Sequence, residues 1–285
     1  MKAQLIDGKR ISAEIKAEAA EEAAALKAKG ITPCLAVVLV GDDSASQVYV
    51  NNKKKACEAV GIRSVSHVLS GGTTEEALLE LIAKLNADQD IHGILVQMPV
   101  PKQIDERKVI LAIDPKKDVD CFHPVNVGNL HTGGEGFLPC TPAGIIELIK
   151  RSGHSIEGKQ CVVIGRSNIV GKPVAMLLMQ ENGTVTICHS RTRNLAEICR
   201  GADIIVSAVG KVNTVTADMV KEGAILIDVG MNRNEAGKLC GDVDFENVKE
   251  IAGAITPVPG GVGPMTIAML MKNCNIAAKI QNGLE

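Results

Sequence analysis

The only tyrosine of the sequence, Tyr49, stands four residues before Lys53. In a helix this spacing places the two side chains one turn apart on the same face. A phenol and an ammonium group held together can bind a substrate and exchange protons with it. The same spacing also arises by chance on helices, so the pair is a candidate that needs support from elsewhere in the chain.

Gln97 and Asp120 are two further polar candidates. Gln97 interrupts the apolar run GILVQM near its end, where parallel α/β sheets place their ligands. Asp120 lies in KKDVDCFHP, within a stretch that is rich in Gly, Pro, Asn and His. A backbone cap or an Asx turn would account for either residue without a catalytic role.

The segment CVVIGRSNIVGKPVAMLL (161–178) has the order strand, glycine-rich turn, helix. This order points backbone N–H groups and a helix N-terminus toward an anion. It is not a P-loop, because Gly165 and Gly171 are one residue too far apart and Pro173 stands where a Ser or Thr would bind magnesium. It also departs from G-x-G-x-x-G, since Arg166 replaces the second glycine. The turn favours a nucleotide site without establishing one.

The next expected strand, 184–188, ends in a basic turn. An NAD site would usually have Asp or Glu here to bind the ribose 2′-hydroxyl. The sequence instead continues CHSRTR, with no acid. The hydroxyl of Ser190 and the guanidinium groups of Arg191 and Arg166 suit a 2′-phosphate, which predicts NADP as the cofactor. A solvated basic loop is the alternative interpretation.

Short β-branched runs alternate with amphipathic helical stretches, which predicts an α/β fold with parallel sheets. Strands are expected at 35–41, 63–69, 92–101, 161–165, 184–188, 203–210 and 224–230. Helices are expected at 11–29, 44–60, up to 86, from 141, and at 265–281, with Ser44, Thr73 and Thr141 at the N-terminal ends of three of them. The stretch 114–142 is expected to be irregular, and TPVPGGVGPMT (256–266) to be a stiff loop before the last helix.

The composition fits a protein of two domains, since 285 residues is near the upper limit for a single core. A net charge of -2, with basic residues spread along the chain, argues against nucleic acid or an anionic membrane as the main partner. No apolar run approaches the roughly 18 residues of a membrane span. The nine cysteines occur singly, without metal-ligand spacing. We expect a cytoplasmic protein without a metal, whose cysteines are small buried hydrophobic residues.

Taken together, these motifs resemble those of the bifunctional methylenetetrahydrofolate dehydrogenase/methenyltetrahydrofolate cyclohydrolase family. The matching stretches occur in order over essentially the whole chain: YVNNKKKACEAVGI, GILVQMPVP, KKDVDCFHPVNVGNL, PCTPAGI, GRSNIVGKPVAMLL, TVTICHSRT, ADIIVSAVG, LIDVGMNR, GDVDF and TPVPGGVGPMT. The resemblance implies two α/β lobes with a cleft between them. One is a folate-binding catalytic lobe, 1–140, completed by the C-terminal helix 265–285, and the other is a Rossmann-type NADP lobe, 141–264. It also implies a homodimer and no metal.

By position, the resemblance gives each candidate a role. The catalytic residues would be Tyr49, Lys53, Gln97 and Asp120. The folate would also contact Pro99, Gly261, Gly263 and Pro264. NADP would contact Gly165, Arg166, Ser167, Ser190 and Met231, to which the basic turn adds Arg191. One departure is visible, because the family usually has glycine where Cys121 follows Asp120. We expect Cys121 to be tolerated if its backbone φ is below zero.

The resemblance implies two consecutive reactions of folate one-carbon metabolism, which feeds purine biosynthesis. First, 5,10-methylenetetrahydrofolate gives a hydride to NADP+, and the resulting 5,10-methenyl cation is then hydrolysed to 10-formyltetrahydrofolate. Lys53 would manage protons in the second step and Gln97 would orient it. Tyr49 would stack on or hydrogen-bond the folate, and Asp120 would pair with N–H groups of the pterin.

Two alternatives stay open from the sequence. One is a dehydrogenase of this architecture that acts on another substrate, such as a shikimate-type hydroxyl, and the other is a non-catalytic NADP-binding sensor. Short-chain dehydrogenases also carry Y-x-x-x-K, but there the pair follows the nucleotide fingerprint. Here the pair precedes the glycine-rich turn by more than a hundred residues, which disfavours that family.

Overall fold

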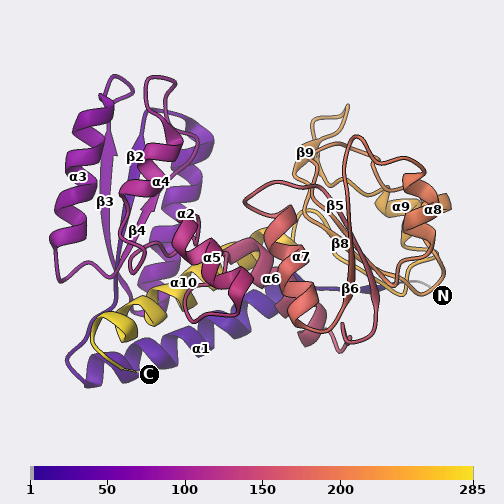
Figure 1. Ribbon diagram of the computed structural model, residues 1–285, viewed down its shortest axis with the longest axis horizontal. Coiled ribbons are helices and arrows are strands. Elements are labelled where there is room, and N and C mark those ends of the chain that lie inside the picture. The colour runs from indigo at the N-terminus through magenta and orange to yellow at the C-terminus, as the bar shows by residue number, and fades with distance from the viewer. Residues whose placement is uncertain (1–2, 285) are drawn as a thin grey trace. The chain divides into compact units, whose positions relative to one another are not determined.

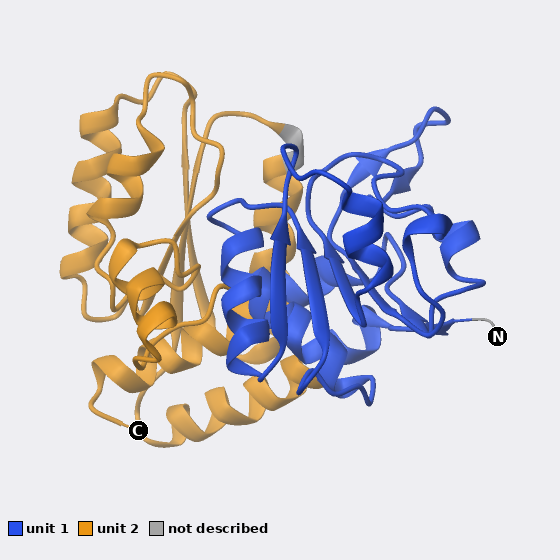
Figure 2. Ribbon diagram, turned by 45° about the vertical axis from the view of Figure 1, so that its right-hand side comes forward, with its two compact units in different colours: residues 1–13, 141–266 blue, residues 14–140, 267–285 orange. Residues whose placement is uncertain are grey.

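The computed structural model describes residues 3–284 and divides into two compact units (Figures 1 and 2). Unit 1 contains the segment that ends at Ala13 and the segment Thr141–Thr266, and unit 2 contains Glu14–Cys140 and the chain from Ile267 onward. The N-terminal segment differs from the predicted division. It groups with unit 1 because β1 (Gln4–Leu5) pairs in parallel with β11 (Ala254–Ile255). Each unit is an α/β structure built on a parallel sheet, which confirms the predicted fold class.

The sheet of unit 2 has the strand order β3-β2-β4, with bounds Arg63–Leu69, Cys34–Val40 and Gly93–Val96. The central strand β2 is a continuous apolar run that is buried at every position, as expected for a parallel strand covered on both faces. The register pairs Val38 with Val96, and the next N–H group, that of Gln97, donates to the carbonyl of Val38. Residues that follow β2 and β4 therefore emerge at one edge of the sheet.

The helices of unit 2 are α2 (Ser44–Val60), α3 (Glu75–Ala87), α4 (Glu106–Ala112) and α5 (Pro124–Thr132), with most of α1 (Gly8–Ala28) and α10 (Val262–Gln281). The carboxylate of Asp43 caps α2 by accepting the N–H of Ser46, and the hydroxyl of Thr74 caps α3. Each cap lies one residue away from the predicted residue, which was Ser44 for α2 and Thr73 for α3. The apolar faces of α3 and α4 pack with the strands in a core that includes Ile82 and Val109.

Unit 1 has a six-stranded parallel sheet in the order β1-β11-β8-β7-β5-β6. The remaining strand bounds are Gln160–Ile164 for β5, Thr184–Cys188 for β6, Ile204–Ser207 for β7 and Ile225–Asp228 for β8. β5 comes first in this βα succession and lies between β6 and β7, so successive connections run to opposite sides of it. In open α/β sheets, ligands bind at such a switch point, beyond the carboxyl ends of the strands.

The helices of unit 1 are α7 (Gly171–Gln180), α8 (Leu195–Arg200) and α9 (Phe245–Val248), with α6 (Cys140–Arg151) beginning at its boundary and a 3-10 turn at Ala217–Met219. A short antiparallel hairpin, β9 (Asn232–Arg233) and β10 (Leu239–Cys240), follows β8. Leu226 and Ile205, from neighbouring strands, belong to the core that this unit buries.

The sequence predicts that the stretch 114–142 is irregular, but part of it is helical in the structure. Its middle forms α5, which starts because the imidazole of His123 accepts the N–H of Val125 and Pro124 occupies the first turn. It ends at Gly133, whose φ of 71° suits glycine. Thr141 is not a cap, because α6 already begins at Cys140.

The glycine-rich segment near the end of the chain also differs from expectation. α10 begins at Val262, so Gly263 and Pro264 lie in its first turn rather than in a loop before it. Proline suits this position because the first N–H groups of a helix have no partner within the helix. Of the predicted loop contacts to folate, only Gly261 lies outside the helix.

Within residues 3–284, no helix has the length and apolar character that a membrane crossing requires. The same part of the chain contains no group of three or more His, Cys, Asp or Glu side chains placed to hold a metal ion.

Candidate functional site

Lys53 and Gln97 meet in unit 2. The ammonium group of Lys53, on α2, donates a 3.0 Å hydrogen bond to Oε1 of Gln97, which follows β4. The amide nitrogen of Gln97 donates in turn to the carbonyl of Met98 at 2.8 Å. Because Lys53 is only 9% exposed, this contact fixes the position of a charge that would otherwise be hydrated. The predicted pairing of Gln97 with Lys53 is therefore present in the structure.

Tyr49 lies one turn before Lys53 on α2, and its side chain is 42% exposed. Large aromatic side chains are usually more buried than this, since they contribute much apolar area to a core. The exposed ring is a surface on which a flat ligand can lie, with a phenol group for a hydrogen bond. Pro99 is also exposed and follows Gln97 closely, and its peptide bond with Met98 is cis.

Asp120 lies near the same ammonium group. Burial raises the pKa of the Asp120 carboxyl, and the positive charge of Lys53 opposes that rise. The thiol of Cys140 lies 4.0 Å from one carboxylate oxygen of Asp120 and 3.4 Å from the carbonyl of Val119. The structure thus brings a lysine, an amide and a carboxyl group together from three separate segments of the chain.

Asn273 is a residue that sequence reasoning missed. Its side chain, 2% exposed, extends from α10 and donates to the carbonyls of Val119 and Leu138 at 2.8 and 2.9 Å. These two carbonyls stand on either side of the loop that carries Asp120. The only signal in the sequence is an asparagine within the apolar run of the last helix, where a buried amide needs partners.

Two of the three charged residues before Asp120 in KKDVD, Lys117 and Asp118, have side chains with structural partners. The ammonium group of Lys117 donates to the carbonyls of Leu85, Asn86 and Asp88 at the end of α3. The carboxylate of Asp118 accepts the N–H groups of Phe122 and His123 and the amide of Asn126. Burial raises the pKa of Asp118 to about 6. The motif therefore anchors the loop at two points, which leaves Asp120 as its candidate for chemistry.

Cys121 does not meet the condition set for it from the sequence. Its φ is 60°, in the left-handed region that favours glycine, whereas tolerance was expected for φ below zero. The side chain is buried, and its thiol donates to the carbonyl of Phe137 at 3.2 Å. The left-handed backbone explains why glycine suits this position. In this chain the hydrogen bond of the Cys121 thiol partly offsets the backbone strain that cysteine has there.

The glycine-rich turn of unit 1 is shaped by close backbone approach. Gly165 has a φ of 125°, and a Cβ there would overlap the carbonyl of Ala208, while a Cβ at Gly171 would overlap the carbonyl of Gly165. The hydroxyl of Ser167 accepts the N–H groups of Val170 and Gly171 at 3.1 and 3.2 Å. Ser167, predicted as a cofactor contact, therefore also caps the start of α7.

The two basic turns follow neighbouring strands. The register pairs Ile164 at the end of β5 with Cys188 at the end of β6, so Arg166 and Ser190 leave the same edge of the sheet. Both are exposed, as is Arg191, whose N–H donates to the imidazole of His189. Within the described residues neither guanidinium has a carboxylate partner, which leaves both available to a phosphate.

Met231, the last predicted cofactor contact, is 56% exposed on the turn that follows β8. A Cβ added at Gly263, in the first turn of α10, would lie 3.8 Å from its Cε atom. Gly261 is packed closely, since a Cβ there would lie 2.7 Å from the carbonyl of Pro257. Pro264 is half-buried beside Gly263.

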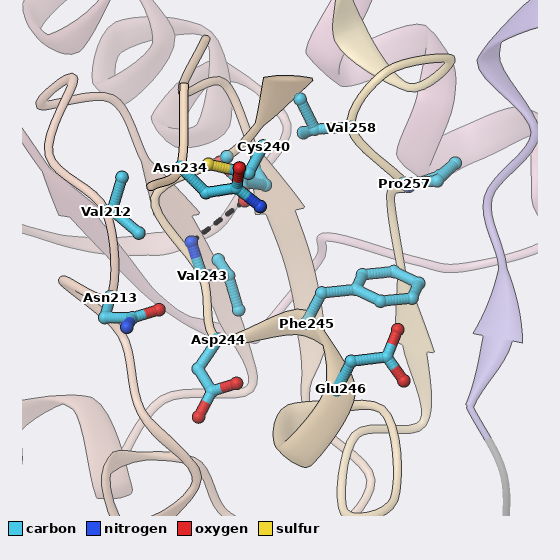
Figure 3. Close-up of a pocket in the computed structure, with 12 residues that line it drawn as sticks. Val212, Asn213, Asn234, Cys240, Val243, Asp244, Phe245, Glu246, Pro257 and Val258 are labelled. Atoms are coloured by element: carbon cyan, nitrogen blue, oxygen red, sulfur yellow. Dashed lines mark hydrogen bonds between the residues drawn. The ribbon is translucent and has the colours of Figure 1, made fainter. Parts of the chain in front are cut away.

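Unit 1 also contains a cavity of 510 Å³ (Figure 3). Its lining comes from Val212 and Asn213, from the hairpin, from Asp244 to Glu246, and from Pro257 and Val258. None of the predicted cofactor residues lines it. The candidate NADP site therefore rests on the strand-end turns and not on this cavity.

Comparison with known proteins gives one consistent family. The model described as tetrahydrofolate dehydrogenase/cyclohydrolase, catalytic domain, matches residues 6–120, and the model for the NAD(P)-binding domain of the same family matches residues 139–282. The chain is 61% identical over 281 residues to a protein of Acetivibrio thermocellus named bifunctional protein FolD, with 99% of each chain covered. A protein of the same name from Moorella thermoacetica is also 61% identical, over 98% of this chain and all of its own.

Solved structures agree with this family. The bifunctional enzyme FolD of Campylobacter jejuni, a methylenetetrahydrofolate dehydrogenase/cyclohydrolase, has a TM-score of 0.95 at 53% identity and covers 98% of this chain and 99% of its own. The enzyme of the same activities from Trypanosoma brucei, solved with NADP and an inhibitor, has a TM-score of 0.92 at 42% identity and covers 98% of both chains.

Proposed function

The chain belongs to the tetrahydrofolate dehydrogenase/cyclohydrolase family, and we infer from this that it is a bifunctional, NADP-dependent enzyme of folate one-carbon metabolism. It oxidises 5,10-methylenetetrahydrofolate to the 5,10-methenyl cation and hydrolyses that cation to 10-formyltetrahydrofolate. The observation in the structure that carries the assignment is the 3.0 Å contact between Lys53 and Gln97, two residues that α2 and β4 bring together. A nucleotide-binding sensor would have no need of that pair.

We propose that unit 2 binds the folate and that Tyr49, Gln97, Pro99 and Asp120 contact it. The exposed ring of Tyr49 suits stacking on a flat ring system. In this proposal the carboxyl group of Asp120 pairs with N–H groups of the pterin, so that no buried donor of the substrate is left unmatched. Of the predicted contacts at the start of α10, Gly263 is exposed and Pro264 half-buried, which leaves them accessible to a ligand, whereas Gly261 is packed against Pro257.

Unit 1 is proposed to hold NADP, and its residues fit that ligand. Arg166, Ser190 and Arg191 present donors and positive charge at the ends of two adjacent strands, as a 2′-phosphate requires. Gly165 and Ser167 shape the turn before α7, and Met231 lies on the turn after β8. When bound, the cofactor supplies the acceptor for the hydride, and the protein supplies its orientation.

The hydrolytic step is assigned to Lys53. Water adds to the methenyl carbon and loses a proton. The bond from that carbon to N5 then breaks, N5 takes up a proton, and the hydroxyl loses its remaining proton as the formyl carbonyl forms. One proton is released overall. Lys53 exchanges these protons with the reacting atoms, because it is the buried cationic group of the site. Gln97 holds the ammonium group in place, and Asp120 supplies the opposing charge.

We further propose that the chain acts in the cytoplasm as a homodimer, without nucleic acid or membrane as a partner. The even distribution of charge and the net charge of -2 support the part of this proposal that excludes nucleic acid and an anionic membrane. Size-exclusion chromatography with light scattering tests the dimer: a mass of twice 30.0 kDa supports it, and a monomer at assay concentration contradicts it.

The function is tested by absorbance spectroscopy of the purified protein with 5,10-methylenetetrahydrofolate and NADP+. The NADPH band should grow only when both are present, and added 5,10-methenyltetrahydrofolate should be hydrolysed without the cofactor. A protein that binds NADP+ but reduces none with this folate would contradict the assignment. The variant Lys54→Met, which removes an exposed lysine next to Lys53, should behave as the wild type in both assays.

A further inference from the structure

Asp242 is a buried carboxylate with five hydrogen-bond donors. Its side chain is 0% exposed and lies two residues after β10. One oxygen accepts the hydroxyl of Ser207 at 3.1 Å and the N–H groups of Val209 and Gly210 at 2.8 and 3.2 Å. The other accepts the N–H of Lys211 and the amide of Asn232, both at 2.9 Å. All five donors are neutral groups, so the carboxylate is satisfied by backbone, hydroxyl and amide dipoles without a cationic partner among them.

These donors come from two separate segments of the chain. Ser207, Val209, Gly210 and Lys211 belong to the end of β7 and the loop after it. Asn232 is the first residue of β9, directly after the turn that follows β8. The sequence separations are 31 to 35 residues for the first segment and 10 for the second. One carboxylate therefore ties together the ends of two neighbouring strands.

Asp228, at the end of β8, supports Asp242 from the other side. Its carboxylate accepts the N–H groups of Gly230, Asp242 and Val243 at 2.8 to 2.9 Å, and the last of these is the dashed line at Val243 in Figure 3. The segment that carries Asp242 is thus fixed by its own backbone as well as by its side chain. This leaves Asp242 little freedom to move away from its donors.

Two glycines make room for the carboxylates. A Cβ at Gly230 would overlap Oδ1 of Asp242, and a Cβ at Gly241 would overlap Oδ2 of Asp228. Gly230 directly precedes Met231, which explains why the turn that carries this residue begins with glycine. The close approach shows that Asp242 packs against the turn itself.

We propose that Asp242 is the positioning residue for the half of the cofactor that accepts the hydride. This rests on the proposed function, which puts the 2′-phosphate at the ends of β5 and β6. In a doubly wound sheet, the second half of a dinucleotide then lies toward the strands on the other side of the switch point, here β7 and β8. Asp242 holds the turns after both of these strands in one arrangement. It acts through them and needs no contact with the cofactor.

The test is the variant Asp242→Asn with Asp244→Asn as its matched control. The amide of the new Asn side chain keeps one acceptor oxygen, but its NH2 group faces N–H donors that it cannot accept. The turns after β7 and β8 therefore lose the carboxylate that holds them together. We expect the KM for NADP+ to rise by about tenfold or more, since only a fraction of the protein then has a competent turn. Hydrolysis of added 5,10-methenyltetrahydrofolate without cofactor should stay within about twofold of the wild type, because that step uses unit 2.

The control removes the same charge two residues away, where the carboxylate of Asp244 accepts the amide of Asn247, and it should leave both activities unchanged. If Asp242→Asn folds and its KM for NADP+ equals that of the wild type, the positioning role is wrong. If both activities fall together in a folded variant, the selective effect is absent and the role is also wrong.

Should Asp242→Asn fail to fold, Asn232→Ala decides the matter, because it removes one donor and keeps the carboxylate. A raised KM for NADP+ with intact hydrolysis supports the proposal, and an unchanged KM overturns it. The wild type separates this inference from the proposed function. A wild type that reduces no NADP+ refutes the function, whereas an active wild type with an equally active Asp242→Asn refutes only the positioning role.

Discussion

The ammonium nitrogen of Lys53 lies 3.0 Å from Oε1 of Gln97, across 44 residues of sequence. The parallel register of β2 and β4 produces this approach, since α2 begins just after β2 and Gln97 follows β4 directly. Gln97 has a second contact, to the carbonyl of Met98, which fixes the orientation of its amide. The oxygen of that amide is therefore directed at Lys53, and the lysine is held by a neutral acceptor.

Replacing Gln97 by Met should slow hydrolysis of 5,10-methenyltetrahydrofolate by about tenfold to a hundredfold, because Lys53 loses its oriented acceptor. The variant retains the volume of the side chain and leaves Lys53 in place. Steady-state assays of both activities measure the effect, with Gln89→Met, at an exposed position, as the control. A wild-type rate of hydrolysis in Gln97→Met would mean that the hydrogen bond has no catalytic role.

Replacing Arg166 and Arg191 by Ala should weaken the binding of NADP+ far more than the binding of NAD+. Each charge-assisted contact to the 2′-phosphate contributes about 1.5–3 kcal/mol, so the KM for NADP+ should rise about tenfold or more per arginine. NAD+ lacks the phosphate, and its KM should change by about threefold or less. Arg200→Ala is the control, since Arg200 is an exposed arginine at the end of α8. An equal loss for both cofactors would contradict the assignment of the 2′-phosphate.

Cys121 allows the backbone strain at φ 60° to be measured. Cys121→Ala and Cys121→Gly both remove the thiol contact to Phe137, but only glycine relieves the left-handed conformation. Cys121→Gly should therefore be more stable to unfolding than Cys121→Ala by about 1 kcal/mol. Urea unfolding of the two variants side by side gives the difference. Equal stabilities, or a more stable alanine variant, would show that the position carries no such strain.

Asp118 should make stability depend on pH. Burial, the largest cause, raises the pKa of its carboxyl from 3.8 to about 6, while hydrogen bonds from Asn126, His123 and Phe122 oppose the rise. The folded chain thus binds this proton more tightly than the unfolded chain. Its contribution to stability is present in full below about pH 4 and is lost as the pH rises through about 6, by up to about 3 kcal/mol.

The measurement is the difference in unfolding free energy between the wild type and Asp118→Asn at several pH values. The wild type should lose stability relative to the variant as the pH rises across that window, and the difference should be constant above it. Asp42→Asn, at an exposed carboxylate, should give a curve parallel to that of the wild type. Parallel curves for Asp118→Asn as well would mean that the carboxyl has no raised pKa.

Continuous patterns were predictable from the sequence, whereas contacts between distant segments were not, apart from that of Lys53 with Gln97. The bounds Ser44–Val60, Arg63–Leu69 and Thr184–Cys188 match the predicted ranges, because periodicity and flanking turn residues are local signals. α5 was missed because its cap is a histidine, His123, in a stretch whose Gly and Asn content suggests a loop.

The supporting residues of the site could not be found from local patterns. Asn273 acts 154 residues away from Val119, and Asp242 binds donors more than 30 residues earlier in the chain. The sequence alone does not tell whether the side chain of an aspartate or asparagine bonds to neighbouring residues or to a distant segment of the chain. Lys53 was found from its spacing to Tyr49 on a predicted helix, and Gln97 because it interrupts an apolar strand. The contact between them follows from the sheet register.

The most direct test of the account is the hydrolysis of 5,10-methenyltetrahydrofolate by Lys53→Met, compared with Lys54→Met on the adjacent exposed lysine. Folate binding, measured by calorimetry, should persist in both variants. We predict that Lys53→Met loses hydrolysis by about a hundredfold or more, because the buried cationic group that exchanges protons is gone. Lys54→Met should hydrolyse at the wild-type rate. A folded Lys53→Met variant that binds folate and hydrolyses the methenyl compound as fast as the wild type would contradict the central role of Lys53.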